Sequence, residues 1–549
     1  MRWKKTIYIF ILSLSSNIAI GQEKQINLYD SARYYYEKKD LIQAFKFYDT
    51  FYADTSNGQS NYDTYFAAVA ACHAGQTEKA KYYLKRSAEI GYDLDSYNFF
   101  ANDTLNQCLH ELPEWKKFID DFKTKADSAN AAINAILSDL KDSTKHVNIS
   151  IMDDENYWQK FQQDHTVQEL IAQIKSFHDF DTPNEKGIWT LYQIKVNDTL
   201  TIPYLLYIPD SYTSSKSTPL YVYLHGAVVN RSAFSNPAHI PNGKEIKIMD
   251  RTKDSFILYP FGKKDFGWIY QQEAFETILR EIVQVKSRYN IDDNKVYVGG
   301  HSNGGSGAFW LALNKPSMFA AFFGLNFLPK VYTGNTTIKN LGNDKTFYGI
   351  SGIEDDVFPY PLVNQIYTFS REQGANWRNY AFHGSHGLAF NHVDSINFLF
   401  DTLATHRRNP FPNEIYWETD DVRNGRYAWI AISKLDTVGE RADWHQPLNP
   451  MVTQNGKTEQ ATFTKSKSGA VRATIRDNII TIESSCVAQI ELYLSPDMID
   501  FDKQVKIYVN GKNTFNFKPQ MSKETILNEF LKTKNRKFIV ASIIKLGVK

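Results

Sequence analysis

The pattern of hydrophobic and polar residues changes several times along this chain of 549 residues. Apolar residues recur at helical spacing up to about residue 185, and the second half of that region is the more polar. Short apolar runs then alternate with helical stretches as far as 408, and strands that alternate around turn sequences follow to the end. Because this length exceeds one ordinary core, we expect several domains.

Small residues recur at a fixed spacing in the first helical region. Ala32 and Ala44 are twelve residues apart, as are Ala68 and Ala80, and the second pair follows the first by 36 residues. Small side chains at this spacing let the two helices of a hairpin approach closely. The pattern therefore predicts repeated helical hairpins.

The region from 186 to 408 is typical of a mostly parallel sheet covered by helices. It starts with two antiparallel strands, Trp189 to Val196 and Thr201 to Ile208, around an Asn197-Asp198 turn. Short apolar runs that suit buried parallel strands then alternate with helical segments. We expect these strands at 220–224, 256–259, 296–299, 319–323, 347–350 and 379–382.

The last region, 409–549, has the pattern of a small β-sandwich. Strands alternate around Asp477-Asn478, and another strand leads into the hairpin turn Asn510-Gly511. A helix is expected near 523–531.

The first 21 residues are typical of a signal peptide. A basic start, Met1 to Lys5, precedes a short apolar run from Ile7 to Leu14. Ala19 and Gly21 are spaced as at a signal-peptidase site, so we expect the mature chain to begin near Gln22. The run is too short to span a bilayer comfortably, and no later stretch is apolar enough. The sequence predicts an exported protein, periplasmic or secreted, with no membrane span after cleavage.

Composition and charge argue against several other classes. A net charge of +1 gives no overall field that would attract nucleic acid or an anionic membrane. The histidines show no spacing suited to zinc, and no glycine loop precedes a Lys-Ser or Lys-Thr pair, so we expect neither metal nor cofactor. Cys72 and Cys108 either form one disulfide in an oxidising compartment or remain buried thiols, as we expect for Cys486.

The strongest chemical signal is the segment Gly300-His301-Ser302-Asn303-Gly304. It follows a predicted strand and opens a predicted helix. A serine nucleophile there needs a sharp turn that exposes its hydroxyl, and small flanking residues make such a turn sterically possible. Serine also needs a general base and an acid that orients the base, and in this arrangement the acid precedes the histidine along the chain.

The acid is expected in the loop Gly352 to Pro359, at the carboxyl end of a predicted strand. The loop contains three carboxylates, of which we choose Asp355. Glu354 and Asp356 are the alternatives; the carboxylates that are not the catalytic acid are expected to be solvated or to hold the loop by hydrogen bonds.

The loop after the next strand supplies the base. It reads Phe382-His383-Gly384-Ser385-His386-Gly387, and its glycines let an imidazole swing over the edge of the sheet. We expect His386, deeper in the loop, to be the base. His383 is expected at the strand end or beside the substrate, and His392 is expected to be structural.

Two backbone N–H groups are expected to bind the oxyanion of the tetrahedral intermediate. One belongs to Asn303, at the start of the helix, and the other to Ala227, in the loop after the strand that ends at Leu224. The imidazole of His225 is expected to brace this loop. Trp268 either lines the substrate pocket or packs in the core.

Several segments resemble the esterase-D, feruloyl-esterase and polyhydroxybutyrate-depolymerase branch of the α/β hydrolases. The segments that carry the resemblance are Tyr204-Leu-Leu-Tyr-Ile-Pro209, Leu224-His-Gly226, Phe266-Gly-Trp268, Tyr289-Asn-Ile-Asp292, Val296-Tyr-Val-Gly-Gly-His-Ser302, Gly304-Gly305 and His386-Gly387. The family's acid lies three residues after a glycine, which singles out Asp355. The same segments are similar to the catalytic domain of the prolyl-oligopeptidase family.

The resemblance covers about 200 of the 549 residues and stops short of the N-terminal helices. Their repeat of 36 residues resembles instead the tetratricopeptide family, which has a repeat near 34 residues. Two positions depart from the hydrolase pattern. Asn303 stands where a bulky apolar residue is common, and Ala227 lies in a loop with few glycines, which leaves the second oxyanion donor open.

Together these observations predict an α/β-hydrolase catalytic domain with helical and β-rich additions. The expected parts are a signal peptide over 1–21, tetratricopeptide-like repeats over 22–125, a helical connector over 126–185, the catalytic domain over 186–408 and the β-rich domain over 409–549.

The expected function is that of an exported carboxylic ester hydrolase, with Ser302, Asp355 and His386 acting through an acyl-enzyme. The alternatives are a serine peptidase of prolyl-oligopeptidase type, with the same triad, and a catalytically silent hydrolase fold that only binds. The expected partners are an ester-bearing substrate, including carbohydrate-linked esters, and a protein or peptide contacted by the helical repeats.

Overall fold

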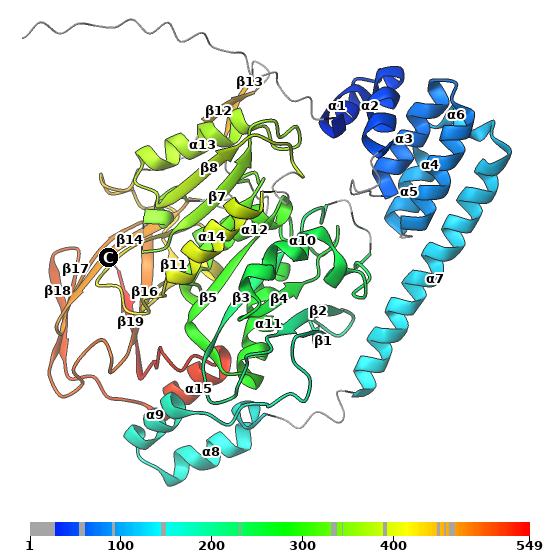
Figure 1. The fold of residues 1–549 in the computed structure, drawn as a ribbon. Coiled ribbons are helices and arrows are strands. Elements are labelled where there is room, and N and C mark those ends of the chain that lie inside the picture. The colour runs from blue at the N-terminus through cyan, green and yellow to red at the C-terminus, as the bar shows by residue number, and fades with distance from the viewer. Residues whose placement is uncertain are drawn as a thin grey trace, which may run out of the picture. The chain divides into compact units, whose positions relative to one another are not determined.

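The structure is a computed structural model whose residues fall into two units (Figure 1). One unit comprises Met1–Tyr92 with Ser96–Lys125, and the other Asp93–Asp95 with Ala126–Lys549. The predicted signal peptide lies outside the described residues. The structure describes residues 28–53, 61–90, 94–143, 150–229, 231, 233–330, 337–342, 344–387, 392–446, 451–454, 457–460 and 467–548.

The first unit is helical, as predicted. Its helices, the last of which continues into the second unit, are α1 (Leu28–Glu37), α2 (Leu41–Ala53), α3 (Asn61–His73), α4 (Thr77–Ile90), α5 (Leu94–Asn102), α6 (Gln107–His110) and α7 (Pro113–Ser143). The four alanines of the repeat, Ala32, Ala44, Ala68 and Ala80, have no exposed surface. Their small side chains therefore lie inside the helix pairs α1–α2 and α3–α4, as the spacing predicts. A disulfide between Cys72 and Cys108 joins α3 to α6.

The second unit contains an eight-stranded sheet. Its strands are β1 (Ile188–Lys195), β2 (Thr201–Ile208), β3 (Thr218–Leu224), β4 (Phe256–Pro260), β5 (Ile291–His301), β6 (Ala321–Leu325), β7 (Phe347–Gly352) and β8 (Trp377–Phe382). They lie in the order β1-β2-β4-β3-β5-β6-β7-β8, with β1 and β2 antiparallel to their neighbours and β3 to β8 parallel. This order, with the antiparallel strands first, is that of the α/β-hydrolase fold and confirms the predicted fold class.

One predicted strand is displaced by two residues. The strand expected at 319–323 is β6, because a 3-10 turn over Pro316–Met318 ends with the N–H of Phe319 bonded to the carbonyl of Pro316.

Alternate residues of each central strand face opposite sides of the sheet. In β3, for example, Leu220 and Val222 face one hydrophobic core, and Tyr221 and Tyr223 face the other. Helices α11 (Gln272–Arg288), α12 (Asn303–Asn314) and α13 (Tyr360–Glu372) cover the first face. Helices α10 (Lys244–Lys247) and α14 (Val393–Thr405) cover the second. Because both faces are covered, the central strands are apolar throughout.

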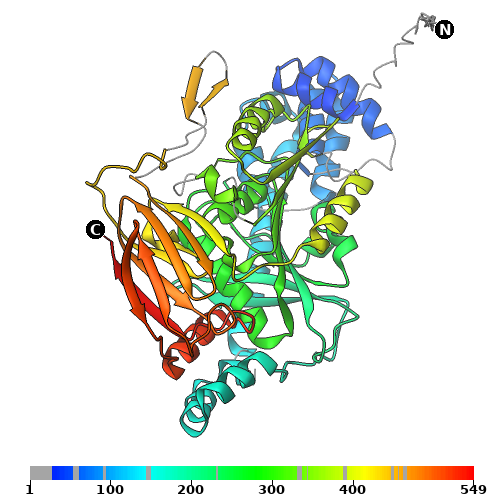
Figure 2. The same ribbon diagram turned by 90° about the vertical axis from the view of Figure 1, so that its left-hand side faces the viewer.

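The C-terminal residues, drawn from yellow to red in Figure 2, form two larger sheets and a separate two-stranded sheet of β12 (Met451–Gln454) and β13 (Lys457–Gln460). The five-stranded sheet has the order β18-β17-β15-β14-β9, and the four-stranded sheet has the order β10-β11-β16-β19. Both contribute to one hydrophobic core, so they form the predicted sandwich. The strands of these sheets are β9 (Glu414–Thr419), β10 (Arg426–Tyr427), β11 (Ile430–Leu435), β14 (Gly469–Arg476), β15 (Ile479–Ser485), β16 (Val487–Leu494), β17 (Val505–Val509), β18 (Lys512–Phe517) and β19 (Ser542–Gly547).

The connector is part of this sandwich core. Its helices α8 (Glu155–Asp164) and α9 (Val167–Ser176) pack against the C-terminal helix α15 (Lys523–Thr533). Trp158 of α8 is fully buried, and its ring meets Phe530 of α15 edge to face at a centroid distance of 5.0 Å. Among the described helices, none is long and apolar enough to cross a membrane.

Candidate active site

Ser302 lies on a sharp turn between strand β5 and helix α12. Its backbone has φ 56° and ψ −123°, a left-handed conformation that costs energy for a residue with a side chain. The N–H of Ser302 donates to the carbonyl of Leu325, at 2.9 Å, and the carbonyl of Ser302 accepts the N–H of Ser306, at 3.1 Å. These bonds hold the strained turn at the carboxyl edge of the sheet.

The glycines around Ser302 are required by close packing against the end of β3. A Cβ atom on Gly304 would lie 1.7 Å from the carbonyl oxygen of Leu224, and one on Gly300 would lie 2.0 Å from the same atom. Both distances are far below van der Waals contact. The small residues of the motif therefore make room for the turn, as the sequence predicts.

The three predicted triad residues lie together at this edge. The Oγ atom of Ser302 is 2.9 Å from Nε2 of His386, and Nδ1 of His386 is 2.8 Å from Oδ2 of Asp355. Since an ionised carboxylate only accepts hydrogen bonds, the Nδ1 nitrogen carries the proton. Nε2 is then free to accept the hydroxyl proton of Ser302.

The carboxylate of Asp355 is buried and accepts three hydrogen bonds. Its Oδ1 atom accepts the backbone N–H groups of Val357, at 3.0 Å, and Phe358, at 2.8 Å, while Oδ2 accepts the His386 proton. The Asp355 side chain is only 2% exposed. These bonds fix the carboxylate in place, and the ring of Phe358 meets the His386 ring edge to face.

Glu354 and His383, the neighbouring candidates, hold the two loops together. Oε1 of Glu354 is 3.0 Å from Nδ1 of His383, and Oε2 accepts the backbone N–H of Gly384 at 2.6 Å. The His383 side chain is 86% exposed. Burial opposes the charge of Glu354, but the hydrogen bonds from His383 and Gly384 lower its pKa. His392, expected to be structural, packs its ring against Phe382.

Asn326, which the sequence pattern did not single out, joins the same two loops. It follows β6 and is fully buried. Its Oδ1 atom accepts the N–H of Gly352, at 2.9 Å, and its Nδ2 group donates to the carbonyl oxygens of Ser385, at 3.1 Å, and His386, at 2.5 Å. Its backbone φ of 44° is a left-handed value that asparagine tolerates better than most residues. The residue type, asparagine, is therefore the one feature of the sequence that could have pointed to this position.

The two residues predicted to supply the oxyanion donors, Asn303 and Ala227, follow Ser302 and Gly226 directly in the chain. Asn303 is the first residue of α12, where a backbone N–H has no partner within the helix. Ala227 has φ 57°, a strained value at the loop position that departs from the glycine-rich pattern. The preceding residue, Gly226, is so close to the nucleophile that a Cβ atom on it would lie 3.0 Å from the Cβ of Ser302.

His225 and Trp268 support this loop from the core. Nδ1 of His225 donates to the carbonyl of Gly226 at 2.8 Å, and Nε2 accepts the N–H of Gly262 at 3.0 Å. Burial and the charge of Arg231 lower the pKa of His225 to about 3, so its ring is neutral. The indole N–H of Trp268 donates to the carbonyl of His225 at 3.1 Å. Trp268 is 1% exposed, so the structure places it in the core rather than on a pocket wall.

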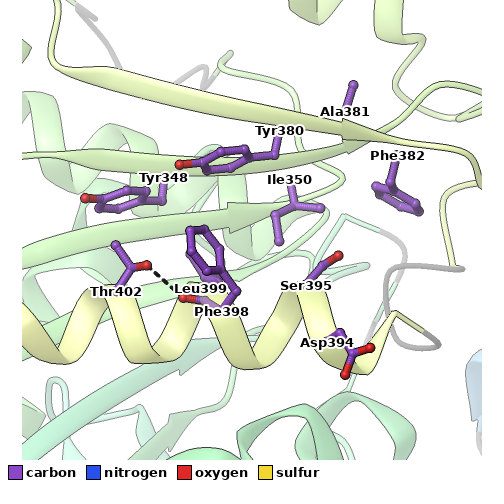
Figure 3. A pocket seen from close by; sticks show the side chains of 10 residues that line it. All are labelled: Tyr348, Ile350, Tyr380, Ala381, Phe382, Asp394, Ser395, Phe398, Leu399 and Thr402. Carbon is purple, nitrogen blue, oxygen red and sulfur yellow. Dashed lines mark hydrogen bonds between the residues drawn. The ribbon is translucent and has the colours of Figure 1, made fainter.

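A pocket of about 410 Å³ lies between strands β7 and β8 and helix α14 (Figure 3). Its apolar lining includes Ile350, Tyr380 and Leu399, and Phe382 at its end is the residue before His383. No member of the triad lines it. The part of the chain that the structure describes contains no group of three His, Cys, Asp or Glu side chains suited to a metal ion.

Solved structures that are similar to this chain carry the names of esterases and peptidases. They include a thermostable esterase, 19% identical, aligned over 40% of this chain and 63% of its own length with a TM-score of 0.34. A ferulic acid esterase is 16% identical over 40% of this chain and 99% of its own, with a TM-score of 0.34. The acylaminoacyl peptidase of Pyrococcus horikoshii is 14% identical over 41% of this chain and 42% of its own, with a TM-score of 0.33.

No protein-family model and no curated protein sequence matches this chain. At such low identity the structural likeness concerns the fold alone and transfers no activity. The fold assignment itself follows from the strand order: this chain carries an α/β-hydrolase domain.

Proposed function

We propose that this protein is a serine hydrolase that cleaves carboxylic esters through an acyl-enzyme. The observation that carries the proposal is the continuous hydrogen-bond chain from Ser302 through His386 to Asp355, with the serine on a strained strand-to-helix turn. Strained backbone is costly and is concentrated at functional sites.

In the first half-reaction the Ser302 oxygen attacks the ester carbonyl carbon while Nε2 of His386 takes the hydroxyl proton. Asp355 stabilises the resulting imidazolium through its bond to Nδ1. The backbone N–H groups of Ala227 and Asn303 donate to the oxyanion, and each such donor is worth roughly 3 kcal/mol. The C–O bond to the leaving group then breaks, and His386 returns the proton to the alcohol.

In the second half-reaction water attacks the acyl-enzyme. His386 takes a proton from the water, the oxyanion forms again in the same donors, and the ester bond to Ser302 breaks. The carboxylic acid leaves, and Ser302 regains its proton from the imidazolium. His225 supports the Ala227 loop throughout as a neutral ring, since its pKa of about 3 keeps it uncharged.

Two observations support export to an oxidising compartment. The N-terminal 21 residues have the pattern of a signal peptide, and Cys72 and Cys108 form a disulfide, which is rare in a reducing cytosol. The substrates that suit an exported enzyme are ester groups on extracellular material, including carbohydrate-linked esters.

The proposal is tested by hydrolysis of p-nitrophenyl acetate and butyrate, and of p-nitroanilide peptides, by the purified protein and by Ser302→Ala. We expect rapid ester turnover, little anilide turnover and a loss of about 10⁴-fold or more in the variant. Ser484→Ala, in strand β15 of the C-terminal sheet, is the matched control and should keep full activity.

Preference for the anilides would assign a peptidase instead. Absence of turnover on both substrate classes would favour a silent hydrolase fold, and ester turnover that survives Ser302→Ala would contradict the proposed nucleophile.

A further inference from the structure

The backbone carbonyl of His386 accepts hydrogen bonds from two side chains outside its own loop. Nε2 of His301 lies 2.9 Å from this oxygen, and Nδ2 of Asn326 lies 2.5 Å from it. His301 is the last residue of β5, directly before Ser302, and Asn326 directly follows β6. The ends of two neighbouring strands therefore meet at one atom of the proposed general base.

The ring of His301 is itself fixed by a carboxylate. Nδ1 of His301 lies 3.4 Å from Oε1 of Glu245, at the start of α10. Burial opposes the charge of Glu245, but its hydrogen bond to His301 and the charges of His301 and Arg231 lower its pKa to about 2. The His386 carbonyl and the Glu245 carboxylate both only accept hydrogen bonds, so contact with both requires a proton on each ring nitrogen of His301: Nδ1 faces the carboxylate, and Nε2, on the far side, donates to the carbonyl.

The loop of His386 has little stiffness of its own. Glycine precedes it at Gly384 and follows it at Gly387, and a Cβ atom on Gly387 would meet nothing within 4 Å. His301 and Asn326, by contrast, are 7% and 1% exposed and are packed at strand ends. The two strand ends can therefore fix the position of the His386 backbone, which the glycine-containing loop alone would not fix.

We propose that His301, oriented by Glu245, and Asn326 are positioning residues that hold the His386 imidazole in line with Ser302. This inference rests on the proposed hydrolase function. Neither side chain takes part in proton transfer; each acts on the base through its backbone. Because a shift of about 1 Å in a reacting group can lower a rate about 100-fold, loss of these bonds should lower kcat and leave KM nearly unchanged.

The test compares variants that remove the hydrogen-bond donor with variants that keep it. His301→Gln retains an amide N–H at about the reach of Nε2, whereas His301→Leu removes the donor. Asn326→Asp preserves size but replaces the donor with an oxygen that repels a carbonyl. We expect His301→Leu and Asn326→Asp to lower kcat on p-nitrophenyl butyrate by about 10- to 100-fold with KM within about threefold. His301→Gln should stay within about fivefold of the parent protein.

The matched control is His178→Leu, which replaces an exposed histidine distant in sequence from His301 and His386. It should leave kcat unchanged. If His301→Leu fails to fold, as judged by circular dichroism, His301→Gln and Asn326→Asp decide the matter by themselves. Equal kcat in Asn326→Asp and the parent protein would overturn the inference. So would equal losses in folded His301→Gln and His301→Leu, or a rise in KM without a fall in kcat.

Different results would exclude the positioning role and the hydrolase function. If the parent protein hydrolyses esters through Ser302 but these variants match it, only the positioning role is wrong. If the parent protein shows no activity dependent on Ser302, the hydrolase function itself is wrong.

Discussion

The nucleophile turn depends on two hydrogen atoms, those that Gly300 and Gly304 have in place of side chains. Gly304→Ala would bring a methyl group to 1.7 Å from the Leu224 carbonyl, so either the turn or the end of β3 must move. We expect a loss of about 3 kcal/mol in stability and loss of ester turnover, measured by denaturant unfolding and kinetics. Gly547→Ala, with no atom within 4 Å, is the control; equal stability of the two variants would contradict the packing argument.

Glu281 is a buried carboxyl with no hydrogen-bond partner among the described residues. Burial raises its pKa well above the ordinary value, so the folded protein binds a proton that the unfolded chain releases above about pH 4.3. Its contribution to stability is therefore complete at low pH and is lost as pH rises toward the folded pKa. We expect Glu281→Gln to raise Tm over the parent protein, and by more at pH 8 than at pH 5. A difference in Tm that is the same at both values would rule out this titration.

The site shows which residues a sequence can reveal. Ser302, Asp355 and His386 each lie in a short motif after a predicted strand, so parallel strands bring them to one edge, and their chain order restricts the pairing. Asn326 and Glu245 have no such motif. Their contacts arise only when strand ends and loops far apart in the sequence meet, so the pattern does not contain them. For Trp268 the sequence left pocket and core open, because a tryptophan beside an active-site loop suits both.

At the scale of elements, the connector helices are part of a hydrophobic core. Trp158→Ala removes a fully buried ring that touches Phe530. We expect it to cost about 3–5 kcal/mol of stability. The measurement is denaturant unfolding monitored by far-ultraviolet circular dichroism, a backbone signal that does not depend on tryptophan fluorescence. Gln159→Ala, on the exposed side of the same helix, should change stability by less than about 0.5 kcal/mol. Comparable effects of both substitutions would show that α8 is only a linker.

The sequence predicted the β-α elements of the eight-stranded sheet well because buried parallel strands have the pattern of short apolar runs. The strands of the sandwich were predicted less completely: β9, β10, β11, β16 and β19 were not predicted. A single residue, Cys486, separates β15 from β16 and takes the chain from one sheet to the other. Its φ of 55° is a value usually marked by glycine or asparagine. Because no turn sequence separates β15 from β16, the alternation of apolar and polar residues does not show where one strand ends and the next begins.

At the scale of the molecule, a buried ionic network joins the sandwich to the α/β-hydrolase fold. Asp293 of β5 lies 2.5 Å from Nζ of Lys286 and accepts the backbone N–H of Arg536 at 2.9 Å. Burial opposes its charge, but Lys286, Arg536 and Arg408 lower its pKa. Its stabilisation is thus present at neutral pH and is lost as acid titrates the folded carboxyl.

Asp293→Asn would leave those buried cations without their shared carboxylate. We expect a loss of about 3–5 kcal/mol at pH 7, measured by denaturant unfolding, that shrinks at low pH where the parent carboxyl is also protonated. Asp198→Asn removes an exposed partner of Lys195, with a side chain 97% exposed, and should have little effect. A loss with Asp293→Asn that does not depend on pH would contradict the ionic explanation.

The most direct test of the account is covalent labelling with a fluorophosphonate, which phosphonylates an activated serine and leaves ordinary hydroxyls unmodified. The purified protein is treated, digested and mapped by mass spectrometry, beside His386→Ala and Ser302→Ala. We predict one adduct, on the peptide containing Ser302, that forms at least about 100-fold more slowly in His386→Ala and is missing in Ser302→Ala. An adduct on another residue, or labelling of Ser302 at the same rate without His386, would contradict the proposed triad.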